Sequence, residues 1–364
     1  MAIAIDDRLA KTGRLTRIMR RPELGALSGT ILVIVLFAIF AGHTGLFTSR
    51  GIVNVLQISA ELGILATAVA LLMIGGEFDL SIGSTIGFAG VVIGMGVTVF
   101  HMPLVASIGV AFLFAILIGY VNGILLIKTG LPSFIVTLAA MFILRGLTLA
   151  VTRSVTGRTQ IPYITQGNED AWYVQIFAGT ALQGFYRWLA AVGLIGTRPD
   201  GAPDIAGVPV SVIWWIALTA IATWVLLNTR FGNWIFAAGG DQSAARNVGV
   251  PVGRVKIILF ILTAVAGTLF ATIQVLTVGS ADTLRGTQKE FEAIIAAVIG
   301  GCFLTGGYGS AIGAAFGALI FGLVQMGIFY TGIDTDWFKV FLGTMVLIAV
   351  LFNNFVRRKA TEAR

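Results

Sequence analysis

The stretch Gly75-Gly76-Glu77-Phe78-Asp79-Leu80-Ser81-Ile82-Gly83-Ser84 places glycines and two carboxylates between two apolar runs, 51–74 and 82–100. Each run is long enough to cross a bilayer, which takes about 20 residues. A charged side chain at membrane depth costs roughly 2.5–3.5 kcal/mol on insertion scales, so such residues usually face a cavity. Glycines that interrupt hydrophobic segments suggest broken helices, which mark binding sites in transporters. A tight turn at the membrane surface, with both acids in water, is the alternative.

The composition is that of a polytopic membrane protein embedded in a lipid bilayer. Of 364 residues, 57% are hydrophobic and only 11% are charged, with a mean hydropathy of +0.94, whereas soluble proteins contain roughly 25% charged residues. The single cysteine, Cys302, excludes an internal disulfide and a cysteine-based metal site. His43 and His101 have no partner at ligand spacing. We therefore expect no metal and no cofactor, and the net charge of +7 does not indicate nucleic-acid binding.

The apolar runs predict an all-α fold of about ten transmembrane helices between a basic tail, 1–23, and a short tail, 357–364. The transmembrane domain covers 24–356. Its eighth run is short and is interpreted as part of a broken helix. The expected spans are 24–42, 51–74, 82–100, 104–127, 132–150, 209–227, 256–276, 291–304, 310–330 and 337–356.

Basic residues predict the orientation of these spans. The two termini and the loops on their side carry 15 lysines and arginines, of which six lie in the basic tail. The short loops on the other side carry three, Arg50, Arg285 and Lys289. Because cytoplasmic loops are enriched in lysine and arginine, both termini are expected in the cytoplasm, with the first helix retained.

The long connection 151–208 is expected to be external. Within it, 172–195 is apolar enough to be an eleventh span, but it contains Gln183 and Arg187 as well as several glycines. An eleventh span would also move one basic terminus to the outside. An external, partly interfacial segment is the favoured interpretation.

An internal repeat is expected. Gly75-Gly76-x-Phe78 precedes Gly83-Ser84-x-x-Gly87, and Gly300-Gly301-x-Phe303 precedes Gly309-Ser310-x-x-Gly313. The copies begin in the second and eighth spans, an even number of crossings apart. They therefore have the same orientation, as in the parallel repeats of some transporters, which bind substrate between repeats.

Polar residues within or beside the spans are the candidates for a substrate pathway. Asp79 or Ser81 could instead cap the helix that starts near Ile82, and Glu61 could pair with a neighbouring helix. Hydroxyl-rich solutes need donors and acceptors in an otherwise apolar pore. The candidate pathway residues are Asn54, Gln57, Glu61, Glu77, Phe78, Asp79, Ser81, Ser84, Asn122 and Glu292.

The most polar cytoplasmic loop is 228–255. Asp241 or Ser243 can cap a short helix there, which Gly249 and Pro251 would end. This helix is either an ordinary connector or a docking element for a cytoplasmic partner. The chain has no G-x-x-x-x-G-K-[ST] motif and no catalytic triad, so we expect it not to be an enzyme and to have no catalytic residue.

Four ordered motifs resemble the ribose-type family of ABC sugar-importer permeases, within the branched-chain amino acid/ribose permease superfamily. Besides 75–84, they are Leu131-Pro-Ser-Phe-Ile-Val-Thr-Leu138, the segment 237–250, and Gly279-Ser-Ala-Asp282 together with 292–301. The resemblance covers about 24–356. It implies a dimeric permease of the bacterial inner membrane, fed by a periplasmic sugar-binding protein and powered by a separate cytoplasmic ATPase.

The resemblance also implies that the loop with Ala244, Ala245 and Arg246 contains the coupling helix, which docks on the ATPase. The coupling-loop residues are Gly239, Gly240, Asp241, Ser243, Ala244, Ala245, Arg246 and Gly249. The resemblance therefore implies that the chain transports a monosaccharide or polyol by alternating access. The identity of the solute is left open. Two departures are the length of 151–208 and Cys302-Phe303, which replaces small polar residues. The alternatives are a secondary transporter driven by ions through the intramembrane acids, and a passive channel.

Overall fold

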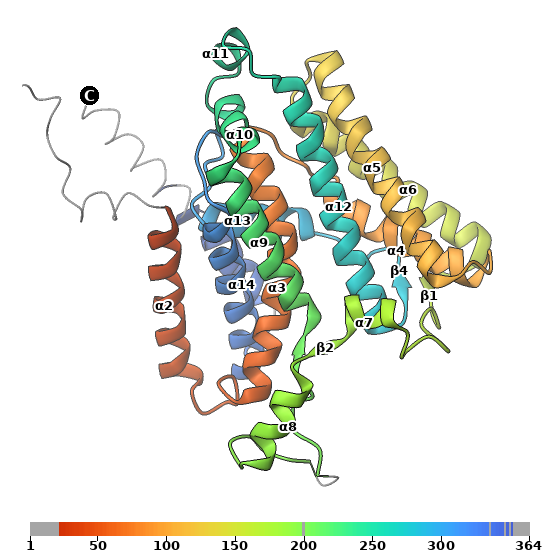
Figure 1. The fold of residues 1–364 in the computed structure, drawn as a ribbon, viewed down its shortest axis with the longest axis vertical. Helices are drawn as coiled ribbons and strands as arrows, with labels where there is room; N and C mark the ends of the chain where they lie inside the picture. The colour runs from red at the N-terminus through yellow and green to blue at the C-terminus, as the bar shows by residue number, and fades with distance from the viewer. Residues whose placement is uncertain (1–21, 199–200, 335, 346, 349–350, 352–364) are drawn as a thin grey trace, which may run out of the picture.

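The computed structural model describes residues 22–198, 201–334, 336–345, 347–348 and 351, and these are mostly helical (Figure 1). Four two-residue strands form two antiparallel pairs, β1 (Gln160–Ile161) with β4 (Ala281–Asp282) and β2 (Thr180–Ala181) with β3 (Val208–Pro209). The helices are α2 (Pro22–Ala41), α3 (Ser49–Ile74), α4 (Ile82–Thr98), α5 (Leu104–Thr129), α6 (Ser133–Thr156), α7 (Trp172–Ala178), α8 (Gln183–Ala191), α9 (Val210–Asn228), α10 (Arg230–Gly240), α11 (Gln242–Asn247), α12 (Val252–Val278), α13 (Lys289–Ile299) and α14 (Ala311–Thr331).

Seven helices in the described part of the chain, α2, α3, α5, α6, α9, α12 and α14, are long and apolar enough to cross a membrane. α4 is apolar but shorter, and α13 has only 11 residues. Residues 337–345 are helical. The rest of the expected last span lies mostly outside the described residues, and so do 1–21 and 357–364. The mostly helical architecture is confirmed, whereas the count of ten spans stays a prediction.

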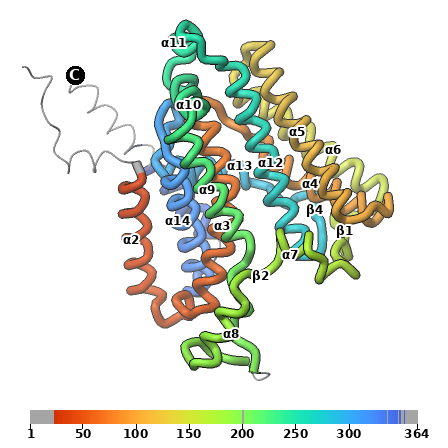
Figure 2. Tube along the Cα trace, in the orientation of Figure 1, coloured from red at the N-terminus to blue at the C-terminus, as the bar shows by residue number. Residues whose placement is uncertain are grey.

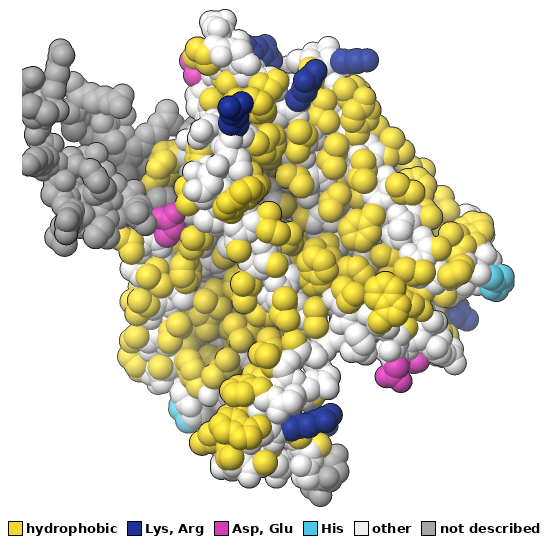
Figure 3. All heavy atoms as spheres, in the orientation of Figure 1, with side chains coloured by type: hydrophobic (Ala, Val, Ile, Leu, Met, Phe, Trp, Pro, Cys, Tyr) yellow, Lys and Arg dark blue, Asp and Glu magenta, His cyan; other side chains and the backbone are white. Residues whose placement is uncertain are grey.

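The centre of the molecule is formed by α3, α12 and α14. α3 packs against α9, α12 and α14, and α12 packs along α4 and α5, while α2 covers α14. The outer helices leave large apolar side chains uncovered, such as Phe40 at 69% exposure and Leu113 at 67%. Figure 3 shows these side chains as a broad hydrophobic band, with Lys and Arg gathered above it around α11. A lipid-facing surface is expected to have this character.

The molecule has two opposite ends, the α11 end and the α8 end (Figure 1). At the α11 end, the chain rises along α9, turns through α10 and α11, and descends along α12 (Figure 2). At the opposite, α8 end, α7 and α8 occupy the segment 172–195. Helices of seven and nine residues are about 10–14 Å long at 1.5 Å per residue, too short to cross a hydrocarbon core of roughly 30 Å.

Several helix boundaries differ from the sequence-based expectation. α6 continues six residues beyond the expected 150, because Thr152 and Thr156 bond to carbonyls one turn back and Gly157 ends the helix in the left-handed region. The short eighth run ends at Ile299 rather than 304, because Gly300 and Gly301 form a turn. In the loop 228–255, α10 is a second helix, and α12 already begins at Val252.

The two glycine turns of the expected repeat have the same backbone structure. After α3, the N–H groups of Gly75, Gly76 and Glu77 donate to carbonyls four, three and five residues back. After α13, the N–H groups of 300–302 repeat this pattern. The second glycine has φ +82° in one turn and +90° in the other, a region that favours glycine. Cys302 therefore leaves the turn unchanged.

Candidate functional site

A cavity of about 220 Å³ lies among α3, α12, α13 and α14. Since a water molecule occupies roughly 30 Å³ in the liquid, the cavity has room for about seven waters or one small solute. Aromatic, amide and charged side chains share its wall. The lining residues are Ile58, Glu61, Leu62, Phe270, Gln274, Arg285, Gly286, Lys289, Phe321 and Gln325.

Glu61 places the cavity halfway along α3. It lies twelve residues after Ser49 and thirteen before Ile74. At 1.5 Å per residue, it is about 18 Å from the start of the helix. Transporters bind their substrates near the bilayer midplane, often beside short or broken helices. The first residue of the short helix α13, Lys289, lines the same cavity.

Hydrogen bonds orient the carboxylate of Glu61. Gln57 Nε2 donates to Glu61 Oε1 at 3.3 Å, and Gln274 Nε2 of α12 donates to Glu61 Oε2. Gln325 Oε1 of α14 is buried and accepts no hydrogen bond from the described residues. The wall thus combines a fixed carboxylate acceptor with two amides, of which Gln325 has an unused acceptor oxygen.

One carboxylate, Glu61, and two cations, Arg285 and Lys289, line the cavity. Arg285 Nη1 donates to the carbonyl of Ser280 at 2.6 Å, and Lys289 forms an ion pair with Glu292. Burial lowers the pKa of Arg285, while the nearby Asp282 and Glu61 oppose this shift. The guanidinium stays charged, since arginine is effectively always protonated in proteins. Each cation of the wall therefore has a carboxylate nearby, an arrangement suited to an uncharged solute with many hydroxyl groups.

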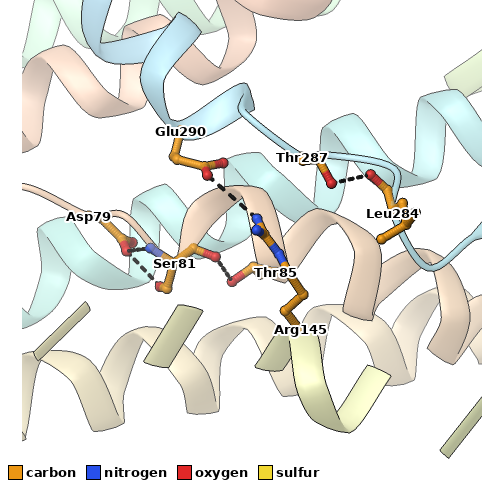
Figure 4. Close-up of polar contacts among 7 residues, drawn as sticks. All are labelled: Asp79, Ser81, Thr85, Arg145, Leu284, Thr287 and Glu290. Carbon is orange, nitrogen blue, oxygen red and sulfur yellow. Dashed lines mark hydrogen bonds and ion pairs between the residues drawn. The ribbon is translucent and has the colours of Figure 1, made fainter. Parts of the chain in front are cut away.

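Asp79 does not line this cavity but joins α4, α5 and α12. Its carboxylate is 1% exposed and accepts hydrogen bonds from the backbone N–H and hydroxyl of Ser81 and from the hydroxyl of Thr263. Asn122 in turn donates to the Ser81 hydroxyl at 3.0 Å. Figure 4 shows Asp79 directed at Ser81 beside the start of α4. The Ser81 side chain makes no capping bond to α4.

Two of the sequence motifs meet at this point. The N–H of Phe78 donates to the Ser133 hydroxyl and the N–H of Leu80 to the Thr137 hydroxyl, both at 3.1 Å. Ser133 and Thr137 lie one turn apart at the start of α6. The polar groups of 75–84 are thus occupied in holding the broken helix against α5, α6 and α12.

An ion pair with a buried carboxylate lies close to Asp79 and Ser81 (Figure 4). Arg145 of α6 and Glu290 of α13 are paired at 3.5 Å, and Glu290 is 2% exposed (Figure 4). A Cβ atom on Gly83 would lie 1.9 Å from Glu290 Oε2, so only glycine fits there. The glycine of α4 therefore allows the start of α13 to pack closely against it.

The remaining pathway candidates lie apart. Asn54 donates to the Tyr330 hydroxyl at 3.3 Å, and Phe78 packs against the core. The Ser84 hydroxyl is buried and forms no hydrogen bond with the described part of the chain. Glu77 forms an ion pair with Lys256. Of the ten candidates, only Glu61 lines the cavity, while Gln57 and Glu292 contact residues of its wall.

Sequence reasoning missed five polar residues. Gln274 and Gln325 are isolated amides within apolar runs, and this was the signal that could have identified them. Arg285 and Lys289 were counted as external loop charges, and Lys256 as a cytoplasmic loop charge. The structure places Arg285 and Lys289 in the cavity wall. Lys256 lies in the buried second turn of α12, with 5% exposure.

The α11 end presents a protruding helix. The Asp241 carboxylate accepts hydrogen bonds from the N–H groups of Ser243 and Ala244, both at 2.9 Å, and so caps α11. Arg246 is exposed and Ala245 is buried. Gly249 has φ +85° and lies just beyond the end of the helix. Val248 is 79% exposed, which is unusual for an apolar residue at a polar end.

Comparison with protein families gives a match over residues 51–350 to the branched-chain amino acid transport system / permease component. This match includes the cavity, both glycine turns and α11. No solved structure matches the chain significantly.

Three curated proteins of Escherichia coli strain K12 are similar over almost their whole length. The ribose import permease protein RbsC is 31% identical, over 89% of this chain and 92% of its own. The xylose transport system permease protein XylH is 29% identical, over 93% of each chain. The probable ABC transporter permease protein YphD is 29% identical, over 94% of this chain and 92% of its own.

Proposed function

Since this chain belongs to the family of branched-chain amino acid transport system permease components, we propose that it is the membrane-spanning subunit of an ABC importer for a monosaccharide or related polyol. Its relatives are transport permeases and not enzymes. The observation that carries the proposal is the polar cavity at the middle of α3.

The cavity fits an uncharged polyhydroxylated solute. Glu61 offers a carboxylate acceptor, and the amides of Gln274 and Gln325 offer donors and acceptors to hydroxyl groups. Phe270 and Phe321 offer apolar surface for the carbon-bound hydrogens of a sugar ring. Small-molecule sites commonly combine apolar walls with a few placed polar groups in this way.

The α11 end is the cytoplasmic end in this proposal, in the bacterial inner membrane. Lys128, Arg230, Arg246 and Arg254 all lie at or near helix termini at that end, as the positive-inside rule requires. The exposed helix α11 then faces a cytoplasmic ATPase, and α7 and α8 face a periplasmic binding protein. A second copy of the permease completes the transporter.

Transport follows alternating access. ATP binding closes the ATPase subunits and moves α11. The movement reaches the two glycine turns, where α3 and α13 end, and these helices re-pack with α14 to open the cavity to the other side. The shared hydrogen-bond pattern of the turns supports their action as a pair related by an internal parallel repeat.

The test is uptake into proteoliposomes that contain the permease with its ATPase and binding protein. Labelled ribose and xylose, the sugars named for its relatives, are the probes. We expect uptake that requires internal ATP and persists when proton and sodium gradients are collapsed. Uptake by the permease alone that follows either gradient would instead support a secondary transporter and overturn the proposal.

A further inference from the structure

Lys256 connects three elements that lie far apart in the sequence. Its ammonium group forms an ion pair with Glu77, in the turn after α3, and donates to Gln242 Oε1 at 3.1 Å. Gln242 is the first residue of α11. Lys256 and Glu77 are 5% and 7% exposed, so the pair is screened from water. One side chain thus holds the coupling-loop helix and the first glycine turn.

The backbone makes a second connection at the same place. The end of α10 lies between the first glycine turn and the loop that follows the second. A Cβ atom on Gly239 would be 1.8 Å from the carbonyl oxygen of Ile74 and 2.8 Å from the nitrogen of Gly307. The Gly307 N–H donates to that same carbonyl at 2.8 Å. A Cβ on Gly306 would be 2.7 Å from Gly76 Cα, so the three segments meet backbone to backbone.

The joined segments lead to the cavity. The Glu77 turn ends α3, which carries Glu61, and the loop with Gly306 and Gly307 joins α13 to α14, which carry Lys289 and Gln325. α12, which carries Lys256, also carries Gln274. A displacement of α11 is therefore transmitted to every helix that lines the cavity. The contacts that transmit it cannot separate without the loss of a buried ion pair or hydrogen bond.

We propose that Lys256 is a positioning residue that fixes α11 to the first glycine turn through Glu77 and Gln242, so that movement of the coupling helix is transmitted to the sugar cavity. This inference rests on the proposed function. It gives Glu77 a role in energy coupling rather than in contact with the sugar.

The test measures ATP hydrolysis and sugar uptake together in proteoliposomes that contain the full transporter. The main variant, Glu77→Gln with Lys256→Met, removes both charges, because removing only one would leave a buried charge without a partner. We expect this variant to assemble with the ATPase and hydrolyse ATP. Uptake per ATP should fall about tenfold, within the roughly 5–150-fold range of coupling effects.

The charge swap, Glu77→Lys with Lys256→Glu, tests the same link by restoring the ion pair with its two charges exchanged. The new glutamate can accept from the amide of Gln242, so the swap keeps both connections and should restore at least half of the uptake per ATP. A purely structural role would lower assembly or melting temperature without changing this ratio. Gln242→Leu removes only the bond to α11 and should raise the ATP used per sugar even if the double variant does not assemble.

Lys128→Met is the matched control, because this exposed lysine ends α5 away from the junction. It should keep the normal ratio of uptake to ATP hydrolysis. A normal ratio of uptake to ATP hydrolysis in the double variant would overturn the role of Lys256 while leaving the importer proposal intact. If the double variant does not assemble, a normal ratio in Gln242→Leu would do the same. Absence of ATP-dependent uptake in the unmodified transporter would instead refute the proposed function itself.

Discussion

The side-chain amide of Gln274 donates a hydrogen bond to Glu61, 213 residues earlier, and joins α12 to α3 in the cavity wall. A hydrogen bond to a charged group contributes roughly 1.5–3 kcal/mol. The same carboxylate also accepts from Gln57. This relationship fixes an acceptor at the middle of α3, and an unpaired carboxylate within a membrane-spanning helix would be costly.

Replacing Gln274 tests the role of the cavity. Gln274→Leu removes a donor that holds Glu61 and contributes to the polar wall, and we expect sugar uptake at saturating binding protein to fall about tenfold. Initial uptake rates in proteoliposomes provide the measurement. Lys128→Met, at the end of α5 and away from the cavity, should keep the normal rate. Equal rates for both variants would show that this cavity is not on the pathway.

Neighbouring glycines in α10 test the backbone junction. Gly239→Ala places a methyl group 1.8 Å from the Ile74 oxygen, whereas a methyl group on Gly240 meets nothing within 4 Å. Overpacking costs roughly 1–3 kcal/mol, so we expect a lower melting temperature for Gly239→Ala. Gly240→Ala should melt no lower than the unmodified permease. The purified protein in detergent is sufficient for this comparison, and equal melting of the two variants would contradict the packing.

Asp79 is expected to be structural. Asp79→Ala leaves the N–H and hydroxyl of Ser81 without their acceptor, at roughly 1–3 kcal/mol for each buried group. The Thr263 hydroxyl loses Asp79 but can still donate to the Phe260 carbonyl at 2.9 Å. We expect a clear drop in melting temperature, and a smaller drop for Thr263→Val. Asp170→Ala is an exposed control that should melt normally. Lost uptake with unchanged melting for Asp79→Ala would instead assign Asp79 to the pathway.

Exposed positions at the two ends test the orientation. Val248 is 79% exposed beside α11, and Leu194 is 69% exposed just beyond α8. In cells, a membrane-impermeant maleimide should label Leu194→Cys from outside and Val248→Cys only after the membrane is opened. The native Cys302 is buried and should stay unlabelled. The reverse pattern would place α11 outside and exclude its docking on a cytoplasmic ATPase.

Short-range features could be predicted from the sequence because local chemistry determines them. The paired glycines before Glu77 predict a broken helix, and the turn does form there. Asp241 two residues before Ser243 predicts a cap for a short helix, and its carboxylate makes both capping bonds. Apolar run lengths predict most of the membrane helices to within a few residues.

The cavity could not be predicted because its wall comes from segments between Ile58 and Gln325 that only tertiary packing brings together. Arg285 and Lys289 look like surface charges when their loop is considered alone. Lys256 looks like the last charge of a loop, because its partner Glu77 lies 179 residues earlier. The acids of 75–84 looked like a pathway, yet the donors that occupy Asp79 come from its own turn and from α12.

Crosslinking can determine whether α11 docks on an ATPase subunit and so couples this permease to it. Ser243→Cys places a cysteine at an exposed position in the first turn of α11. This variant is combined with a panel of single cysteines in the ATPase subunit of the assembled transporter. We expect a crosslink whose yield changes with nucleotide, and none for Gln183→Cys at the opposite end. No crosslink from Ser243→Cys under any nucleotide condition would contradict this docking.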